Sequence, residues 1–216
     1  MKNIIAKSFT TILIAMVTFL DAQTINRYGT TTANFLEIGI GSRATSMGDA
    51  YVAVANDVSS IYWNPAGLSH VTNSSALFSI QPWLVDIDMM FAGGAFVVPS
   101  VGVIGLGITH LDYGEMDVTN LEYQDGTGER FGASDVAATF TFSRKIVSWF
   151  SFGSSMKYIS SKIWHSSASA FAVDLGVLVN TNFFSFTGKD KDGMNIGMSI
   201  SNYGTRMKYD GIDNYQ

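Results

Sequence analysis

An alternation of period two begins at Ser74, and it constrains the fold of this chain more than any other feature. In residues 134–144, Phe140 and Phe142 share one face, and Thr141 between them points the other way. Successive side chains of a β-strand project to opposite faces of the sheet. The pattern therefore predicts a strand with one bulky apolar face and one small or polar face.

The same alternation recurs along most of the remaining sequence, in residues 101–112, 148–159, 169–180 and 194–203, and less cleanly in 74–81 and 85–98. This gives about seven strands, with the start of an eighth at Thr205. Their length, about ten residues or more, is what a tilted membrane strand requires. The inward faces carry Gly, Ser, Thr and Ala rather than the charges of a solvated face.

These patterns predict an all-β fold, an antiparallel transmembrane β-barrel, over a soluble β-sandwich, whose strands would also alternate. Only 14% of residues are charged, against about 25% in soluble domains. Aromatic residues are expected near strand ends, where membrane barrels carry girdles: Trp83, Trp149, Trp164, Phe183, Phe184 and Phe186. Tight turns at residues 98–100 and 145–148 and a long polar loop at 114–133 fit the same architecture.

Residues 1–22 predict a secretory signal peptide. Lys2 and Lys7 precede an apolar stretch from Phe9 to Leu20, and Ala22 is the expected last residue before cleavage. This stretch is too short for a membrane anchor. The chain has a net charge of −5 and no basic cluster, so a nucleic acid is not an expected partner.

Residues 23–73 lack the period of two and predict a compact, irregular plug inside the barrel. Asp57 is expected to cap a short helix over residues 58–63, because its carboxylate can accept free N–H groups of the first turn. Pro65 ends that helix and moves Asn64 out of the α region, and Gly67 then permits a turn.

The charged residues Arg43, Asp49 and Asp57 of this segment are candidates for pairing with charges on the inward face of the strands, such as Asp135, Lys157 or Asp174. For Asp57, the helix cap alone is the favoured role.

No catalytic or metal-binding arrangement is predicted. His70, His110 and His165 lack metal spacing, and the chain has no cysteine and no Gly-x-Ser-x-Gly elbow. Asp190-Lys191-Asp192-Gly193 matches only part of a calcium loop and is better explained as a polar turn. We expect a protein that is not an enzyme and needs no cofactor.

The stretch GSRATSMGDAYVAVANDVSSIYWNPAGLS, within Phe35–His70, closely resembles the N-terminal region of the PorV/PorQ-type outer-membrane proteins, relatives of the FadL hydrophobe transporters. Further matching pieces are HLDYGEM, DGTGERFGAS, MKYISSKI, AVDLGVLV and SNYGTRMKY. The resemblance implies a non-enzymatic outer-membrane protein of type IX secretion that binds or shuttles secreted cargo. Its implied partners are outer-membrane lipid, cargo proteins and other secretion components.

The resemblance also leaves alternatives open. FadL-type relatives pass hydrophobic small molecules through the membrane, so a diffusion channel is the second hypothesis, and a soluble secreted β-sandwich is the third. The motif Asn64-Pro65-Ala66-Gly67 matches the plug of FadL-type proteins, which implies a role in lining or gating a ligand path. A rigid turn that locks the plug fits the same residues equally well.

Strand number sets a further expectation. A barrel of eight strands has an interior just filled by side chains, with no room for a plug of about 40–50 residues. FadL-type barrels, as the resemblance implies, have more strands. Residues 74–216 are therefore expected to be the first part of a larger barrel. The edge strands would be completed by chain beyond Gln216 or by a second copy.

Overall fold

The computed structural model describes residues 33–85, 87–187 and 193–211, so the expected signal peptide lies outside the described residues. The strands are β1 (Ser75–Pro82), β2 (Asp88–Val98), β3 (Gly102–Asp117), β4 (Arg130–Val147), β5 (Phe150–Ile163), β6 (Ser166–Asn180), β7 (Asn195–Gly204) and β8 (Asp210–Gly211). The helices are short: η1 (Asn34–Glu37), α2 (Ser42–Thr45), α3 (Ser60–Trp63) and η2 (Pro65–His70). Among the described residues, no helix has the length and apolarity to span a membrane.

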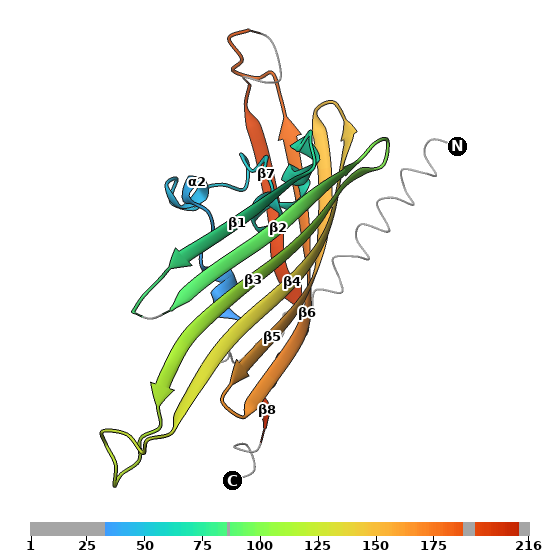
Figure 1. Cartoon of the computed structure of the whole chain (residues 1–216). Helices are drawn as coiled ribbons and strands as arrows, with labels where there is room; N and C mark the ends of the chain where they lie inside the picture. The colour runs from blue at the N-terminus through green and yellow to red at the C-terminus, as the bar shows by residue number, and fades with distance from the viewer. Residues whose placement is uncertain (1–32, 86, 188–192, 212–216) are drawn as a thin grey trace, which may run out of the picture. The chain divides into compact units, whose positions relative to one another are not determined.

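The strands form one open antiparallel sheet in the order β1-β2-β3-β4-β5-β6-β7, with β8 paired to β6 (Figure 1). Each strand pairs with its neighbour in sequence, because tight turns join β2 to β3 and β4 to β5 as the sequence predicts. The predicted all-β antiparallel class is confirmed. The described residues make a single curved sheet and not the two packed sheets of a sandwich.

The two faces of the sheet differ as the alternation predicts. Ala137 and Thr141 are completely buried on the inner face of β4, whereas Phe140 between them is 50% exposed. On β6, Phe171 is 58% exposed and its neighbour Ala172 is buried. A soluble sheet with one wet face buries its apolar side and exposes its polar side. This sheet does the reverse along β3 to β6.

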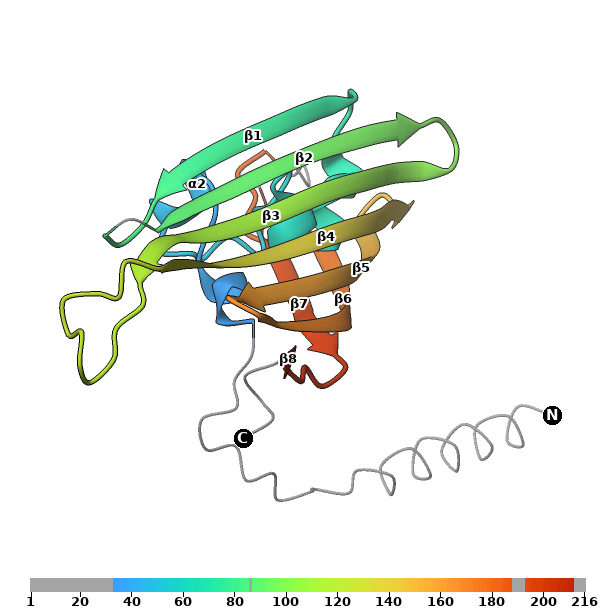
Figure 2. The ribbon, with the colours of Figure 1, turned by 60° about the horizontal axis from the view of Figure 1, so that its bottom comes forward.

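Residues 33–74, called here the N-terminal segment, cover the inner face of the sheet (Figure 2). A hydrophobic core joins the two layers: Phe35, Ile61 and Leu68 of the segment pack with Phe91 and Leu111 of the strands. The N-terminal segment therefore buries the inner face, whereas no other described part of the chain covers the outer face.

Some element boundaries differ from the expectations. The loop expected over residues 114–133 is shorter, because β3 continues to Asp117 and β4 begins at Arg130. The extension follows a register shift between Asp112 and Glu115, with Gly114 at a φ of +72°. Such a bulge bends a strand without ending its pairing. The Arg130 guanidinium then lies 3.0 Å from Asp117 and 3.2 Å from Glu115 across the two strands.

Two other expected elements are shorter than predicted. Helix α3 begins at Ser60 and not at residue 58, although the Asp57 carboxylate does accept the backbone N–H of Ser59 at 2.9 Å. This bond satisfies a donor in the turn that leads into the helix. The strand expected from Thr205 is limited to the two residues of β8.

Candidate functional site

The Asn64-Pro65-Ala66-Gly67 motif is the part of the N-terminal segment that contacts strands β4 to β6. Asn64 is completely buried. Its Nδ2 donates to the carbonyl oxygens of Val52 (2.8 Å) and Val177 (3.2 Å), and its Oδ1 accepts the N–H of Ala66 (3.1 Å). The side chain therefore joins two parts of the segment to strand β6.

Glycines on the inner face let the backbone of this motif approach the strands closely. A Cβ added to Gly176 of β6 would lie 2.1 Å from Asn64 Oδ1, and one added to Gly153 of β5 would lie 2.3 Å from the carbonyl carbon of Pro65. Real Cβ atoms do not approach other heavy atoms this closely, so neither position admits a larger residue without a shift of the segment.

Strand β4 holds the motif through a hydroxyl group. Ser143 Oγ accepts the N–H of Ser69 at 3.1 Å and donates to the carbonyl oxygen of Ala66 at 3.1 Å. Ser69 Oγ donates to the same carbonyl at 2.8 Å. Three adjacent strands, β4, β5 and β6, thus contact the motif, and the result is a rigid anchor for the segment.

Gly67 closes the motif inside the segment. Its N–H donates to the carbonyl oxygen of Asn64 at 2.9 Å. A Cβ here would lie 2.3 Å from the carbonyl oxygen of Ala55 and 2.8 Å from Ser60 Oγ. The position requires glycine for close packing, and its φ is not in the left-handed region.

A buried ion pair lies on the same inner face. Lys157 Nζ of β5 is 2.9 Å from Asp174 Oδ2 of β6, and the two side chains are 3% and 1% exposed. Asn202 of β7 completes the group: its Oδ1 accepts from Lys157 Nζ at 2.7 Å, and its backbone N–H donates to Asp174 Oδ1 at 2.7 Å.

The geometry of strand β7 explains why Asp174 receives a backbone N–H. The register of β6 and β7 shifts between Val173 and Leu175, and Asn202 adopts a left-handed φ of +59°. A bulge leaves an N–H without its partner in the ladder, and asparagine tolerates this conformation better than most residues. The Asp174 carboxylate satisfies that N–H and balances the Lys157 charge.

The N-terminal segment reaches this ion pair through Tyr62. Lys157 Nζ lies 5.9 Å from the centre of the Tyr62 ring, within the range of a cation–π contact. The Tyr62 hydroxyl lies 2.8 Å from the carbonyl oxygen of Leu36 and 2.7 Å from that of Ile38. Burial, together with the nearby carboxylates, raises the pKa of Tyr62 well above its usual value, so the phenol remains a neutral donor.

Two charged residues of the segment, Arg43 and Asp57, pair with each other. Arg43 Nη1 lies 3.4 Å from Asp57 Oδ2, and both side chains are about half exposed. Asp57 also accepts the Tyr51 hydroxyl at 2.9 Å, and burial followed by this bond raises the pKa of Tyr51. The Asp49 carboxylate packs against Gly39.

The structure thus brings Arg43 and Asp57 together. In the described part of the chain, no salt bridge joins either of them, or Asp49, to the inward charges of the strands.

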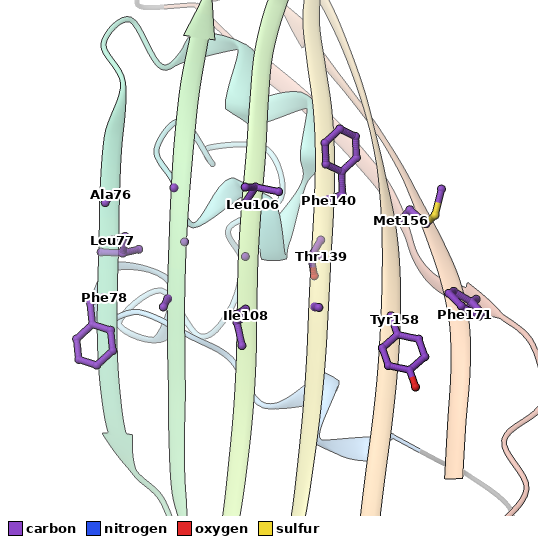
Figure 3. Close-up of a pocket in the computed structure, with 15 residues that line it drawn as sticks. Ala76, Leu77, Phe78, Leu106, Ile108, Thr139, Phe140, Met156, Tyr158 and Phe171 are labelled. Atoms are coloured by element: carbon purple, nitrogen blue, oxygen red, sulfur yellow. The ribbon is translucent and has the colours of Figure 1, made fainter.

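The outer face carries a shallow apolar groove of about 790 Å³ (Figure 3). Small residues of β1, β2 and β4 form part of its lining, namely Ala76, Ala92, Gly94 and Ala138. Bulky side chains surround them: Phe78, Leu106, Ile108, Phe140, Met156, Tyr158 and Phe171. The groove is therefore a lipophilic surface with almost no polar group.

Several residues of the anchor were not predicted from the sequence. The alternation of the sequence places Gly153, Gly176 and Ser143 on inward faces, but it does not mark them as contacts of the motif. Glycine inside a strand is a signal of close backbone approach, and this signal points to both glycines. Asn202 gives no comparable signal. Among the described residues, no group of three or more His, Asp or Glu side chains could hold a metal ion.

Comparison with known proteins gives one result. A sequence model of the family described as "Type IX secretion system protein PorV" matches residues 21–216. No curated protein and no solved structure matches the chain. The match extends over nearly the whole chain. The chain therefore belongs to the PorV family of type IX secretion system proteins.

Proposed function

We propose that this chain is a non-enzymatic outer-membrane component of type IX secretion that binds or shuttles secreted cargo proteins. Membership of the PorV family supports the part in secretion. The observation that supports a location in the membrane is the reversed burial of the sheet: Phe140 and Phe171 are exposed, while Thr141 and Ala172, the residues that follow them in their strands, are buried. Exposed apolar area of this extent is stable only against lipid or a partner protein.

Within this proposal, residues 23–73 act as a plug and residues 74–216 as part of the barrel wall. The anchor supports the plug: Asn64 bonds to β6, Gly153 and Gly176 receive Pro65 and Asn64, and Ser143 holds Ala66. A segment bound to three strands in this way stays in place while cargo or lipid contacts other surfaces.

Fractionation tests the membrane part of the proposal. The mature protein should sediment with outer membranes and require detergent for extraction, because water cannot solvate the outer face without cost. Recovery of folded protein in the soluble periplasmic fraction would contradict the proposal.

Complementation tests the secretion part. A strain that lacks the gene should retain cargo inside the cell and should release it again when the wild-type chain is supplied. The variant Asn64→Ala with Pro65→Gly loosens the anchor and should restore release only in part. Asn73→Ala changes an exposed asparagine beside β1 and serves as the matched control. Normal cargo release in the deletion strain would refute the role in secretion.

A diffusion channel for hydrophobic small molecules is the second candidate, because the apolar groove of about 790 Å³ on the outer face can hold such a molecule. The anchored segment opposes it, because the segment covers the inner face of the sheet. Uptake of a radiolabelled long-chain fatty acid separates the two functions. A deletion strain with normal cargo release and reduced uptake would support the channel.

A further inference from the structure

The connection between β1 and β2 presents three consecutive apolar residues to solvent. Trp83 is 47% exposed, Leu84 64% and Val85 98%. These residues, called here the β1–β2 tip, lie at the same end of the sheet as the β3–β4 loop (Figure 1). Single exposed apolar residues are common on protein surfaces, and Leu121 of that loop is one, with polar residues on both sides. Contiguous exposed apolar residues mark a contact surface.

Backbone hydrogen bonds hold the tip in one shape. The Trp83 N–H donates to the carbonyl oxygen of Ile87 at 2.8 Å, and the Ile87 N–H donates to that of Leu84 at 3.1 Å. Val85 has a φ of +55°, a left-handed conformation that β-branched residues rarely adopt and that Gly or Asn adopts easily. The valine is thus unfavourable for the turn, and its side chain packs on almost nothing in the described residues. Backbone strain of this kind is common at binding sites, which makes the valine side chain a candidate contact.

Two carboxylates lie between the tip and the apolar outer face of β2 and β3. Asp88 of β2 and Asp112 of β3 are exposed and lie directly opposite each other in the register. Alternation places them on the outer face, with Ala92 and Ile108. Between described residues, no salt bridge includes either carboxylate. Like charges directly opposite each other destabilise a strand pair, so a cation from another molecule would stabilise this one.

These carboxylates favour a protein over lipid as the partner of the tip. Anionic lipid headgroups attract basic residues and repel carboxylates at the same level. On the outer face, the register puts Lys162 two strands away from Asp112, with Ser134 between them. A protein surface can combine an apolar pocket for Trp83 with Lys or Arg at its border, and aromatic anchors at protein interfaces fill apolar pockets within such a polar rim.

We propose that the β1–β2 tip docks into an apolar pocket of a protein partner, and that Lys or Arg residues at the border of that pocket pair with Asp88 and Asp112. Trp83 and Val85 supply the apolar contact, and the closed turn presents them with little loss of backbone entropy on binding. The inference rests on the proposed outer-membrane location, which gives the sheet its lipid-facing side. It goes beyond the proposed function because it assigns a docking surface to particular residues.

Site-specific photocrosslinking of the full chain in living cells tests this assignment. The photoreactive residue p-benzoylphenylalanine replaces Leu84 in one variant and Leu121 in the matched control, because both are exposed leucines at the same end of the sheet. Irradiation should give a protein adduct of a single mass at position 84, and about a tenth of that adduct or less at position 121. The captured protein is identified by mass spectrometry, purified, and titrated against the wild-type chain in nanodiscs of dioleoylphosphatidylcholine.

Two variants separate docking from folding. Val85→Gly suits the positive φ and should unfold at the wild-type temperature or above, because glycine adopts this conformation without strain. It should nevertheless weaken binding of the captured protein about fivefold, because the contacting side chain is lost. Asp88→Asn with Asp112→Asn removes both charges and keeps an acceptor for the Gly114 N–H. This double variant should weaken binding about tenfold and reduce its dependence on salt.

Lipid is the other occupant that the tip could have, and Trp83 reports on it. Vesicles of dibrominated phosphatidylcholine should not quench the part of the fluorescence that Trp83→Phe removes. Quenching of that part, an adduct within the same chain, or a captured protein that binds both variants as well as the wild type would overturn the proposal. A protein adduct that meets these tests supports docking even if the deletion strain releases cargo normally. Loss of cargo release without a protein adduct at position 84 would refute the docking surface alone.

Discussion

The buried pair of Lys157 and Asp174 gives the sharpest test of the inner face. Each side chain is at most 3% exposed and the charged atoms are 2.9 Å apart, a separation at which their attraction is about 6 kcal/mol with an effective dielectric constant of about 20. Desolvation of both charges offsets much of this attraction, so the intact pair adds little net stability. Removal of one partner leaves the other charge buried and unpaired, which typically costs about 3–5 kcal/mol.

The variants Lys157→Gln and Asp174→Asn should therefore each lower the free energy of unfolding by about 3–5 kcal/mol. The amide oxygen introduced by Asp174→Asn can still accept the N–H of Asn202. The double variant contains no charge and should be clearly more stable than either single variant, with a cost below about 2 kcal/mol. Arg130→Gln is the control, because its salt bridges with Glu115 and Asp117 are exposed and such pairs contribute about 0–1 kcal/mol.

Equilibrium unfolding in urea, followed by tryptophan fluorescence in detergent micelles, measures these free energies. The double-variant cycle then gives the coupling between the two sites. A double variant whose cost equals the sum of the single costs would refute the coupling of the two charges. Single variants that each cost no more than Arg130→Gln would show that the pair is solvated.

Three further outcomes follow from the same structure. Gly176→Ala places a Cβ 2.1 Å from Asn64 Oδ1 and should lower the free energy of unfolding by about 1–3 kcal/mol or more. Gly94→Ala is the control and should lower it little, because its Cβ meets only ring atoms of Phe96 at 3.4 Å or beyond. Thermal unfolding of both variants measures the difference. Val173→Arg on the outer face should lower the folding stability in a bilayer by about 2–4 kcal/mol, and Ser199→Arg on the inner face should lower it less. Equal losses of stability in a reversible folding assay would show that the faces are assigned wrongly. Burial and the charge of Lys145 lower the pKa of His70 below its unfolded value of 6.5, so the unfolded chain binds more protons than the folded chain. The free energy of unfolding should therefore fall as pH drops below about 6.5. A His70→Gln variant whose stability depends on pH in the same way as that of the wild type would contradict this.

The alternation predicted the faces of the strands because it depends only on strand geometry. Phe140 and Thr141 lie on the expected sides, and the inward residues of β4 to β6 are buried. The ends of β3 and β4 were not predicted. The bulge after Asp112 and the bonds between Arg130 and its two carboxylate partners extend the pairing into a stretch that has the composition of a loop.

The pairing register of β5 and β6 could not be predicted from the sequence, and the contact between Lys157 and Asp174 depends on it. Lys157 and Asp174 were both assigned to inward faces, but alternation does not say which residues of two strands lie opposite each other. The register pairs Lys157 with Ala172 and Ser155 with Asp174, so the two charges meet as diagonal neighbours. Turn lengths and the packed segment determine this register, and neither can be derived from one strand alone.

The local chemistry of the N-terminal segment was predicted better than its contacts. Asp57 does accept a backbone N–H before α3, and Pro65 begins the next helical turn. The partners of Asn64 could not be foreseen, because Val177 lies on a strand that the motif meets only through tertiary packing. The roles of Asn64-Pro65-Ala66-Gly67 in secretion or in gating remain predictions.

The hydrogen bonds of the anchor also bear on the order in which the chain assembles. Asn64 and Val177 are 113 residues apart, and Ala66 and Ser143 are 77 residues apart. Hairpins such as β2–β3 close over far shorter loops, and contacts between distant residues form later because loop closure costs entropy first. The surface that receives Asn64 and Pro65 exists only once β4, β5 and β6 have paired. The segment is synthesised before these strands, yet we expect it to be the last of the described elements to reach its final position.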